Sequence, residues 1–147
     1  MMITLERASE IDIATLLRTE KKLAGMKTYS PILDVDGWKE ELKKCVVYLI
    51  KKDGVVVGNT SYERQNGAVY LSGLAIEPEF QHQGIGREVL QRILEEVKDT
   101  SRIWLVTHPD NAASLRLYQS LGFVVESRKE NYFGDGAPRL VLGLQKK

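Results

Sequence analysis

Cysteine, histidine and any surplus of charge are scarce in this chain of 147 residues, and each scarcity excludes a class of protein. Cys45 is the only cysteine, so no disulfide can form within the chain, and with only two histidines beside it we expect no metal site. The 21 Lys and Arg residues nearly balance the 20 Asp and Glu residues, which leaves a net charge of +1 and no basic surplus to favour nucleic acid or an anionic membrane. No apolar run nears the ~20 residues of a membrane-spanning helix.

The length and the hydrophobic content suit one domain. With 147 residues, 43% of them hydrophobic, the chain is long enough to bury a core without disulfides or metal. Residues Met1–Arg7 lack the basic region and the long apolar stretch of a signal peptide. We therefore expect a single domain over residues 1–147, in the cytoplasm, as a monomer or homodimer. Its expected partner is a small molecule or a peptide, and neither nucleic acid nor a membrane.

Hydrophobic periodicity predicts an α/β (α+β) chain with more strands than helices. Alternating or β-branched apolar residues predict strands at 3–7, 46–50, 55–64, 68–76, 102–107, 123–126 and 139–144. Apolar residues that recur every three or four positions predict helices at 9–25, 36–44, 85–97 and 112–121. Turn signals such as Asp53-Gly54 join the early strands as antiparallel hairpins.

The stretch 71–94 is the most informative part of the chain. A strand ends before Pro78, the loop Gln81–Gly86 follows, and an amphipathic helix begins. A glycine-containing turn that leads into a helix presents unpaired backbone N–H groups and the positive end of the helix dipole, which favours an anion such as pyrophosphate. Two known phosphate loops do not fit, because Val89 stands where a dinucleotide fingerprint needs a glycine and Arg87 where a P-loop needs lysine. On these residues alone, a turn that only redirects the chain is an equal alternative.

Two segments carry a family resemblance. The loop Gln81-His82-Gln83-Gly84-Ile85-Gly86 matches Gln/Arg-x-x-Gly-x-Gly/Ala, and the segment Asn111–Phe123 matches Asn-x-x-Ala/Ser-x-x-x-Tyr-x-x-x-Gly-Phe. In these signatures and their order the chain resembles the GNAT superfamily of N-acetyltransferases, and its C-terminal half most resembles the ribosomal-protein alanine N-acetyltransferase branch. The resemblance implies the GNAT fold, a mixed and mostly antiparallel seven-stranded sheet flanked by about four helices, whose fourth and fifth strands splay around the cofactor.

The resemblance also implies an enzyme that transfers the acetyl group of acetyl-CoA directly to a primary amine of a small molecule or of a peptide or protein N-terminus. Main-chain groups of Leu74, Ala75 and Ile76 would pair with the pantetheine arm and steady the thioester oxygen. Tyr118 would act as the general acid that protonates the departing thiolate. The other implied cofactor contacts are Gln81, His82, Gln83, Gly84, Ile85, Gly86, Arg87, Asn111 and Ser114. Taken singly, a tyrosine in a helix is usually a core residue and an asparagine before one is usually a cap.

The resemblance does not supply the general base. Val106 and Tyr70 stand where two branches of the family carry glutamate. His108, at the end of the predicted fifth strand, is a possible base because imidazole titrates near neutral pH, and Glu63 and Glu77 are the other candidates. Without an obvious base we expect an α-amine, or an amine whose pKa neighbouring charges depress, as the easier acceptor. At pH 7 an amine of pKa about 7.8 is roughly a tenth unprotonated, whereas one of pKa about 10.4 is free only a few times in ten thousand.

Two alternatives stay open for the function. A chain of this kind can sense acyl-CoA without turnover, or it can transfer an acyl group bulkier than acetyl, which depends on the pocket near Leu74 and Tyr118. The loop Asn131–Pro138 either shapes the acceptor site or is only the tip of a hairpin.

Overall fold

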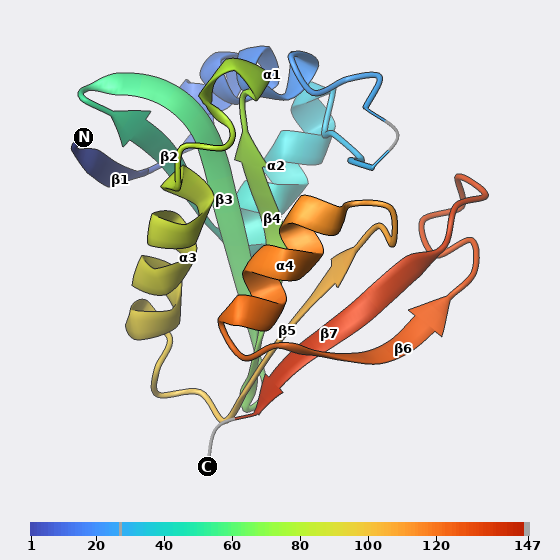
Figure 1. Ribbon diagram of the computed structural model, residues 1–147. Helices are drawn as coiled ribbons and strands as arrows, with labels where there is room; N and C mark the ends of the chain where they lie inside the picture. The colour runs from blue at the N-terminus through green and yellow to red at the C-terminus, as the bar shows by residue number, and fades with distance from the viewer. Residues whose placement is uncertain (27, 146–147) are drawn as a thin grey trace.

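One seven-stranded sheet with helices on both faces makes up the computed structural model, which describes residues 1–26 and 28–145 (Figure 1). The strands are β1 (Ile3–Arg7), β2 (Val46–Lys52), β3 (Val55–Gln65), β4 (Ala68–Ile76), β5 (Arg102–Thr107), β6 (Val124–Lys129) and β7 (Arg139–Gln145). The α-helices are α1 (Ile13–Lys21), α2 (Val35–Lys44), α3 (Ile85–Glu96) and α4 (Ala112–Ser120), and short 3-10 turns cover Glu10–Asp12 and Pro78–Phe80.

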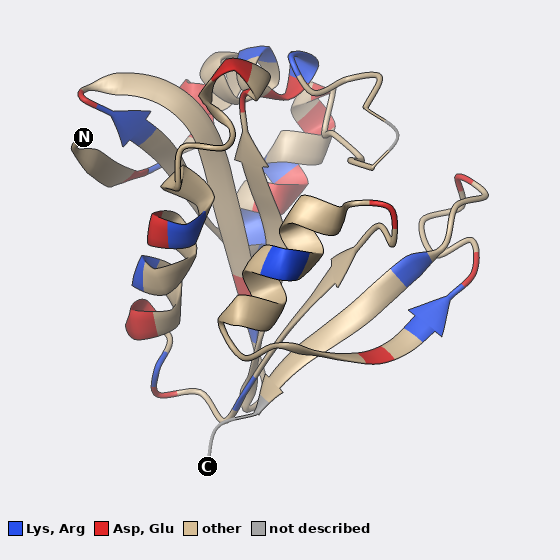
Figure 2. Cartoon of the chain, viewed as in Figure 1, with Lys and Arg blue, Asp and Glu red and all other residues tan. Residues whose placement is uncertain are grey.

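The strand order confirms the predicted fold class. It is β1-β2-β3-β4-β5-β7-β6, and each neighbouring pair is antiparallel except β4 and β5, which are parallel. In Figure 1, α3 and α4 lie in front of the sheet and α2 lies behind it. Charged residues of both signs are interspersed along the elements (Figure 2). Among the described residues, no helix is long and apolar enough to cross a bilayer.

Two hydrophobic clusters, one on each face of the sheet, explain the unbroken apolar run in β2. Tyr48 and Ile50 pack into the cluster under α3, whereas Val47 and Leu49 pack into the cluster under α1 and α2. Successive side chains of a strand point to opposite faces, so a strand covered on both faces is apolar at every position. β2 is therefore packed on both faces of the sheet.

The first helix is shorter than predicted for residues 9–25. Residues Glu10–Asp12 form a 3-10 turn, and α1 spans only Ile13–Lys21. The Asp12 carboxylate accepts a hydrogen bond from the Ser9 N–H at 2.9 Å, and this short side chain closes the first turn tightly. Leu23 is buried although it follows the helix, so the periodic apolar pattern overestimated the helix length.

β4 and β5 separate halfway along their length, as predicted. Residues Ala68–Leu71 pair with Arg102–Leu105, and beyond them β4 pairs only with β3. At the point of separation Ser72 is an extra residue in β4, because its neighbours on either side pair with consecutive residues of β3. A bulge of this kind bends a strand and increases its twist. The bulge therefore lies where the two strands open, and the opening holds the site.

Candidate active site

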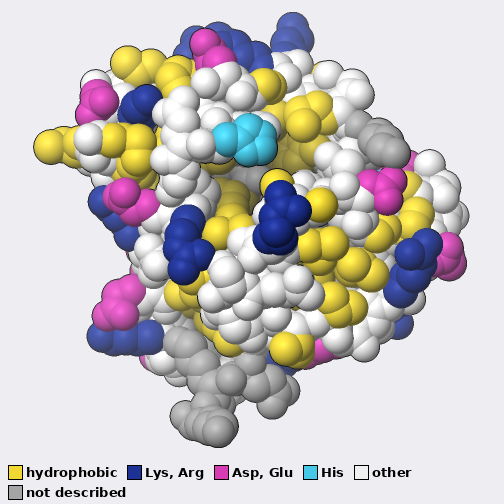
Figure 3. Space-filling view, in the orientation of Figure 1, with side chains coloured by type: hydrophobic (Ala, Val, Ile, Leu, Met, Phe, Trp, Pro, Cys, Tyr) yellow, Lys and Arg dark blue, Asp and Glu magenta, His cyan; other side chains and the backbone are white. Residues whose placement is uncertain are grey.

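A hollow opens between the start of α3 and α4, at the end of β4 (Figure 3). It has a volume of about 290 Å³. Basic and histidine side chains stand at its rim and hydrophobic ones lie inside. Gln83 is not in its lining, because the Gln83 side-chain oxygen accepts a hydrogen bond from Lys52 Nζ at 2.8 Å, which ties the side chain to β2. The predicted cofactor residues that do line it are Leu74, Ala75, Ile76, Gln81, His82, Gly84, Ile85, Gly86, Arg87, Asn111 and Ser114.

The loop before α3 has the backbone geometry of an anion site. His82 and Gly84 have φ angles of 63° and 84°, in the left-handed region that turns neighbouring N–H groups to one side. Gly84 is the N-cap of α3, so N–H groups of the first turn have no acceptor within the helix. Arg87 adds a positive charge here, and its guanidinium donates to Ser120 Oγ at 2.7 Å. The loop can hold a phosphate group through its main chain.

Main-chain groups of β4 face the gap at alternate residues. The Glu77 N–H donates to a β3 carbonyl at 2.8 Å. The main-chain groups of every second residue before it, such as Ala75, therefore also face β3. The main-chain groups of Leu74 and Ile76 therefore face the gap, where no strand in the described part of the chain pairs with them. Gln81 Nε2 donates to the Ile76 carbonyl at 2.9 Å. The rest of this edge can pair with an extended amide chain as another strand would.

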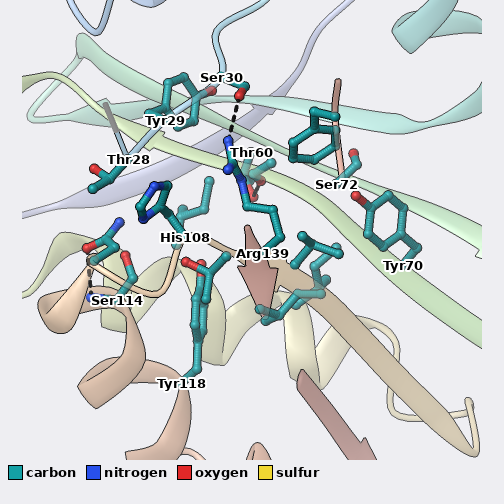
Figure 4. A pocket seen from close by; sticks show the side chains of 18 of the residues that line it. Thr28, Tyr29, Ser30, Thr60, Tyr70, Ser72, His108, Ser114, Tyr118 and Arg139 are labelled. Atoms are coloured by element: carbon teal, nitrogen blue, oxygen red, sulfur yellow. Dashed lines mark hydrogen bonds between the residues drawn. The ribbon is translucent and has the colours of Figure 1, made fainter. Parts of the chain in front are cut away.

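α4 presents Asn111, Ser114 and Tyr118 on one face, because spacings of three and four residues repeat around a helix. Asn111 is the N-cap, and its Oδ1 accepts a hydrogen bond from the Ser114 N–H at 3.2 Å. Tyr118 points into a second cavity of about 120 Å³ (Figure 4). Its ring lies edge-on to Phe123 with centroids 5.9 Å apart, and burial raises the pKa of Tyr118 to about 12. The hydroxyl therefore stays protonated at neutral pH and can act as a proton donor.

His108 lies in the same cavity, but its lone pair is engaged. The ring is buried, and Nδ1 accepts a hydrogen bond from the Asp110 N–H at 3.0 Å. A neutral imidazole has one N–H and one lone pair, so Nε2 carries the hydrogen in this arrangement. His108 is thus placed as a hydrogen-bond donor, and this geometry does not suit a proton acceptor.

The two predicted carboxylate candidates lie outside these cavities. Glu77 is buried, and its Oε1 accepts a hydrogen bond from Lys22 Nζ at 2.9 Å, which ties the end of β4 to the segment after α1. Glu63 is half-buried on β3, where Oε1 accepts from Gln65 Nε2 at 3.4 Å. Within the described residues, no group of three or more His, Cys, Asp or Glu is placed to hold a metal ion.

A third cavity, of about 410 Å³, adjoins the second, and Tyr29 lines all three. The Tyr29 hydroxyl lies 2.9 Å from both carboxylate oxygens of Glu20, to which it donates. Glu20 also accepts from the Ile32 N–H at 3.0 Å and from Asn59 Nδ2 at 3.3 Å. Burial raises the pKa of Glu20, and burial together with the nearby Glu20 charge raises the pKa of Tyr29. Tyr29 and Ile32 are therefore held over the opening.

Arg139, the first residue of β7, closes the opening on the side of the loop 131–138. Its side chain is 3% exposed, and Nη2 donates to Asp135 Oδ2 at 3.0 Å and to Ser30 Oγ at 3.1 Å (Figure 4). The guanidinium also lies 5.0 Å from the centre of the Phe133 ring. Arg139 thus joins Asp135 of the loop 131–138 to Ser30 across the cavity, and Phe133 contributes to the lining.

Sequence reasoning missed Tyr29, Glu41, Ser72 and Arg139, which line the second and third cavities. For Ser72 a signal was present, because a Ser-Gly pair inside an apolar strand is typical of a bulge. The other three residues stand in segments without any motif.

Comparison with known proteins places this site in a family. The model of the Acetyltransferase (GNAT) family matches residues 11–123, which include the loop before α3 and the whole of α4. The chain belongs to the GNAT family of acetyltransferases. The resemblance inferred from the two sequence signatures is thereby confirmed.

Individual GNAT proteins show how far the likeness extends. The ribosomal protein bS18-alanine N-acetyltransferase of Escherichia coli (strain K12) is 35% identical over 65 residues, which are 43% of this chain and 44% of that protein, so the chain spans less than half the length of this curated relative. The crystal structure of the ribosomal-protein-S18-alanine N-acetyltransferase from Escherichia coli has a TM-score of 0.83 at 21% identity, covering 98% of this chain and 94% of that one. YncA from Salmonella typhimurium, solved with acetyl-CoA, has a TM-score of 0.77 at 23% identity, covering 99% and 94%. At these identities the two structures establish the fold.

Proposed function

We propose that this protein transfers the acetyl group of acetyl-CoA directly to a primary amine, either of a small molecule or of a peptide or protein N-terminus. The observation that carries the proposal is the position of Tyr118, in the cavity that connects the hollow beside α3 with the third cavity. A cosubstrate entering from the α3 side and an amine entering from the other side meet at this hydroxyl. We place the reaction in the cytoplasm, where acetyl-CoA is available.

Residues of the hollow suit the parts of acetyl-CoA. The N–H groups of the loop before α3, with Arg87, are proposed to bind the pyrophosphate. The unpaired edge at Leu74 is proposed to pair with the amides of the pantetheine arm, and Asn111 and Ser114 lie across the hollow from it. When bound, acetyl-CoA supplies a thioester whose carbonyl carbon is open to attack by an amine.

The proposed reaction needs one proton donor and one proton acceptor. The nitrogen lone pair forms a bond to the carbonyl carbon, and the carbon–sulfur bond breaks with its electron pair left on sulfur. The Tyr118 hydroxyl, kept protonated by its pKa of about 12, donates to that sulfur. The acceptor starts as an ammonium and loses two protons. The first frees the lone pair and is released, and the second, lost after the attack, replaces the proton that Tyr118 gave to sulfur, so the net products are an amide, coenzyme A and one released proton.

The size of the cavity at Tyr118 favours acetyl over longer acyl groups. Its volume is about 120 Å³. That space suits an acetyl group and an incoming amine.

The test is release of coenzyme A thiol from acetyl-CoA with pools of peptide α-amines, lysine peptides, polyamines and aminoglycosides. We expect turnover with at least one pool, and slower turnover when a longer acyl-CoA replaces acetyl-CoA. No turnover in any pool, with acetyl-CoA binding measured by calorimetry intact, would instead support the acyl-CoA sensor.

A further inference from the structure

A carboxylate and two hydroxyl groups form a closed triangle in the third cavity. Glu41 of α2, Ser61 of β3 and Ser72 in the β4 bulge contribute one oxygen each. Ser61 Oγ and Ser72 Oγ donate to Glu41 Oε2 at 2.9 Å and 2.8 Å, and the two hydroxyl oxygens lie 2.7 Å apart. All three contacts have the length of ordinary O–H···O hydrogen bonds.

Counting hydrogens shows what the triangle lacks. Each serine hydroxyl has one hydrogen, so two hydrogens serve three contacts while Glu41 is ionised. A proton on Oε2 completes the ring, because each of the three oxygens then donates once and accepts once. The Cys45 thiol, whose pKa burial raises to about 11, lies 3.6 Å from Ser72 Oγ and supplies at most a weak further donor. Glu41 Oε2 can therefore take up one proton within this ring of hydrogen bonds.

Ser72 connects this triangle to the reacting centre. Ser72 lines both the cavity at Tyr118 and the third cavity, whereas of these two cavities Glu41 lines only the third. The bulge is the reason, since it places the Ser72 side chain where β4 leaves β5. In Figure 4, Ser72 and Tyr118 lie on the walls of one pocket.

Glu41 is the carboxylate of the third cavity that is left to accept a proton, because the other carboxylates there are already paired. Glu20 is saturated by Tyr29, Ile32 and Asn59. Among the described residues, no Lys or Arg is within ion-pair distance of Glu41. The remaining titratable and charged side chains that line this cavity are Tyr29, Lys44, Tyr70 and Asp135, and Asp135 is paired with Arg139.

We propose that Glu41 receives the proton lost by the acceptor amine, by way of the Ser72 hydroxyl; this rests on the proposed acetyl transfer. An ammonium gives one N–H proton to Ser72 Oγ while Ser72 passes its own hydrogen to Glu41 Oε2, which frees the nitrogen lone pair for attack. Ser72 ends unchanged, and Tyr118 protonates the sulfur. The nitrogen loses its second proton after the attack and that proton restores Tyr118, while Glu41 releases the first proton to water. Glu41 thus acts through Ser72, which itself touches the amine.

This proposal changes the expected range of acceptors. The expectation of an α-amine followed only from the missing base, because an amine of pKa about 10.4 is almost wholly protonated at pH 7. With a proton acceptor in the cavity, amines of higher pKa become substrates as well.

The test compares Glu41→Gln with Glu40→Gln, a matched control on the same helix whose side chain is 73% exposed. Kinetics are measured from pH 6 to pH 10 with two acceptors of similar shape whose amine pKa values are about 8 and about 10. We expect Glu41→Gln to lower kcat roughly 100-fold at pH 7 for the more basic amine, with a smaller loss for the other. The loss should shrink as the pH approaches the pKa of each amine, and Glu41→Asp should recover part of the rate.

Other outcomes overturn the proposal in separable ways. An equal loss at every pH and for both acceptors indicates a structural role, and a change in the acceptor KM with kcat retained indicates that Glu41 only binds the cation. Ser72→Ala should reproduce the pH-dependent pattern; if it unfolds, Glu41→Gln decides the question alone, with unchanged thermal unfolding and acetyl-CoA affinity as the check on its fold. A wild-type protein that acetylates neither amine contradicts the proposed function, whereas an active wild type with an unaffected Glu41→Gln contradicts only this inference.

Discussion

The change Tyr118→Phe removes one hydroxyl from the proposed reaction centre and leaves the ring in place. The ring packs edge-on against Phe123 at a centroid distance of 5.9 Å, and that contact does not involve the oxygen. We therefore expect thermal stability to change little. Any loss of activity then reports on the hydroxyl alone.

The size of the loss follows from the bond that the hydroxyl makes. A hydrogen bond to a charged group contributes about 1.5–3 kcal/mol, and 1.4 kcal/mol is a factor of ten. A hydroxyl that donates to a developing thiolate should therefore be worth roughly ten- to a hundredfold in kcat. Activity should not vanish, because a thiol of pKa about 8.5 leaves reasonably well without help.

The assay is thiol release under saturating acetyl-CoA from pH 7 to pH 10. Because burial raises the pKa of Tyr118 to about 12, its proton is lost only as the pH rises towards 12, so the ratio of wild-type to variant kcat should be constant over this range. Tyr48→Phe is the matched control, since its hydroxyl bonds to Glu96 and it lines none of the three cavities. Unchanged kcat, or a ratio that falls well before pH 10, would refute the assignment of Tyr118 as the acid.

Four further changes test the site and its supports. Gly84→Ala should lower the unfolding free energy by about 1–2 kcal/mol, because φ is 84° there, and should also weaken acetyl-CoA binding in calorimetry. Gly54→Ala in the β2–β3 turn, at φ 87°, should lose similar stability with affinity unchanged, and equal affinity in both variants would argue against the anion loop. Glu20→Gln should lower stability by about 1–3 kcal/mol and raise the acceptor KM, because its N–H₂ group would replace one of the two oxygens and face a donor, either the Ile32 N–H or Asn59 Nδ2. Urea unfolding and kinetics measure both, and an unchanged KM would show that Tyr29 does not need Glu20. Hydrogen bonding to Arg102 lowers the pKa of Glu126, so the wild type should be more stable than Glu126→Gln by up to about 1 kcal/mol at pH 7. This advantage should be lost as the pH falls through the folded-state pKa of Glu126. Urea unfolding at pH 7 and pH 3 measures it, and an advantage that persists at pH 3 would contradict the ion pair.

Secondary structure was predictable wherever local pattern and tertiary burial agree. β5 has the predicted bounds, Arg102–Thr107, because both of its ends are marked by turn residues and alternate residues, among them Ile103 and Leu105, are buried in the core. The predicted length of the first helix was wrong, because Leu23 is buried by a turn that continues the helical spacing. Periodicity reports which side chains are buried, and burial does not require the helix to continue.

The two halves of the site differ in how far local sequence could predict them. The cofactor half is built from two continuous segments, 81–87 and 111–118, whose backbone geometry depends on neighbours in sequence. The other half combines the α1–α2 connection, α2, the β4 bulge and the loop before β7. The bond between Arg139 and Ser30 joins residues 109 positions apart, and no local pattern indicates such a pair.

What the sequence determined by itself is the set of features that short-range physics controls: the left-handed turn at Gly84, the cap at Asn111, the alternation of buried side chains and the family signatures. Only the tertiary structure decided where the proton acceptor lies. Glu41 is a charged residue on a charged helix and looks like a solvated one, until the packing of α2 against the sheet brings it to Ser61 and Ser72, 20 and 31 residues away. Hydrogen bonds between such distant residues depend on how the elements pack, because the chain entropy lost in closing these loops is recovered only when the whole sheet forms.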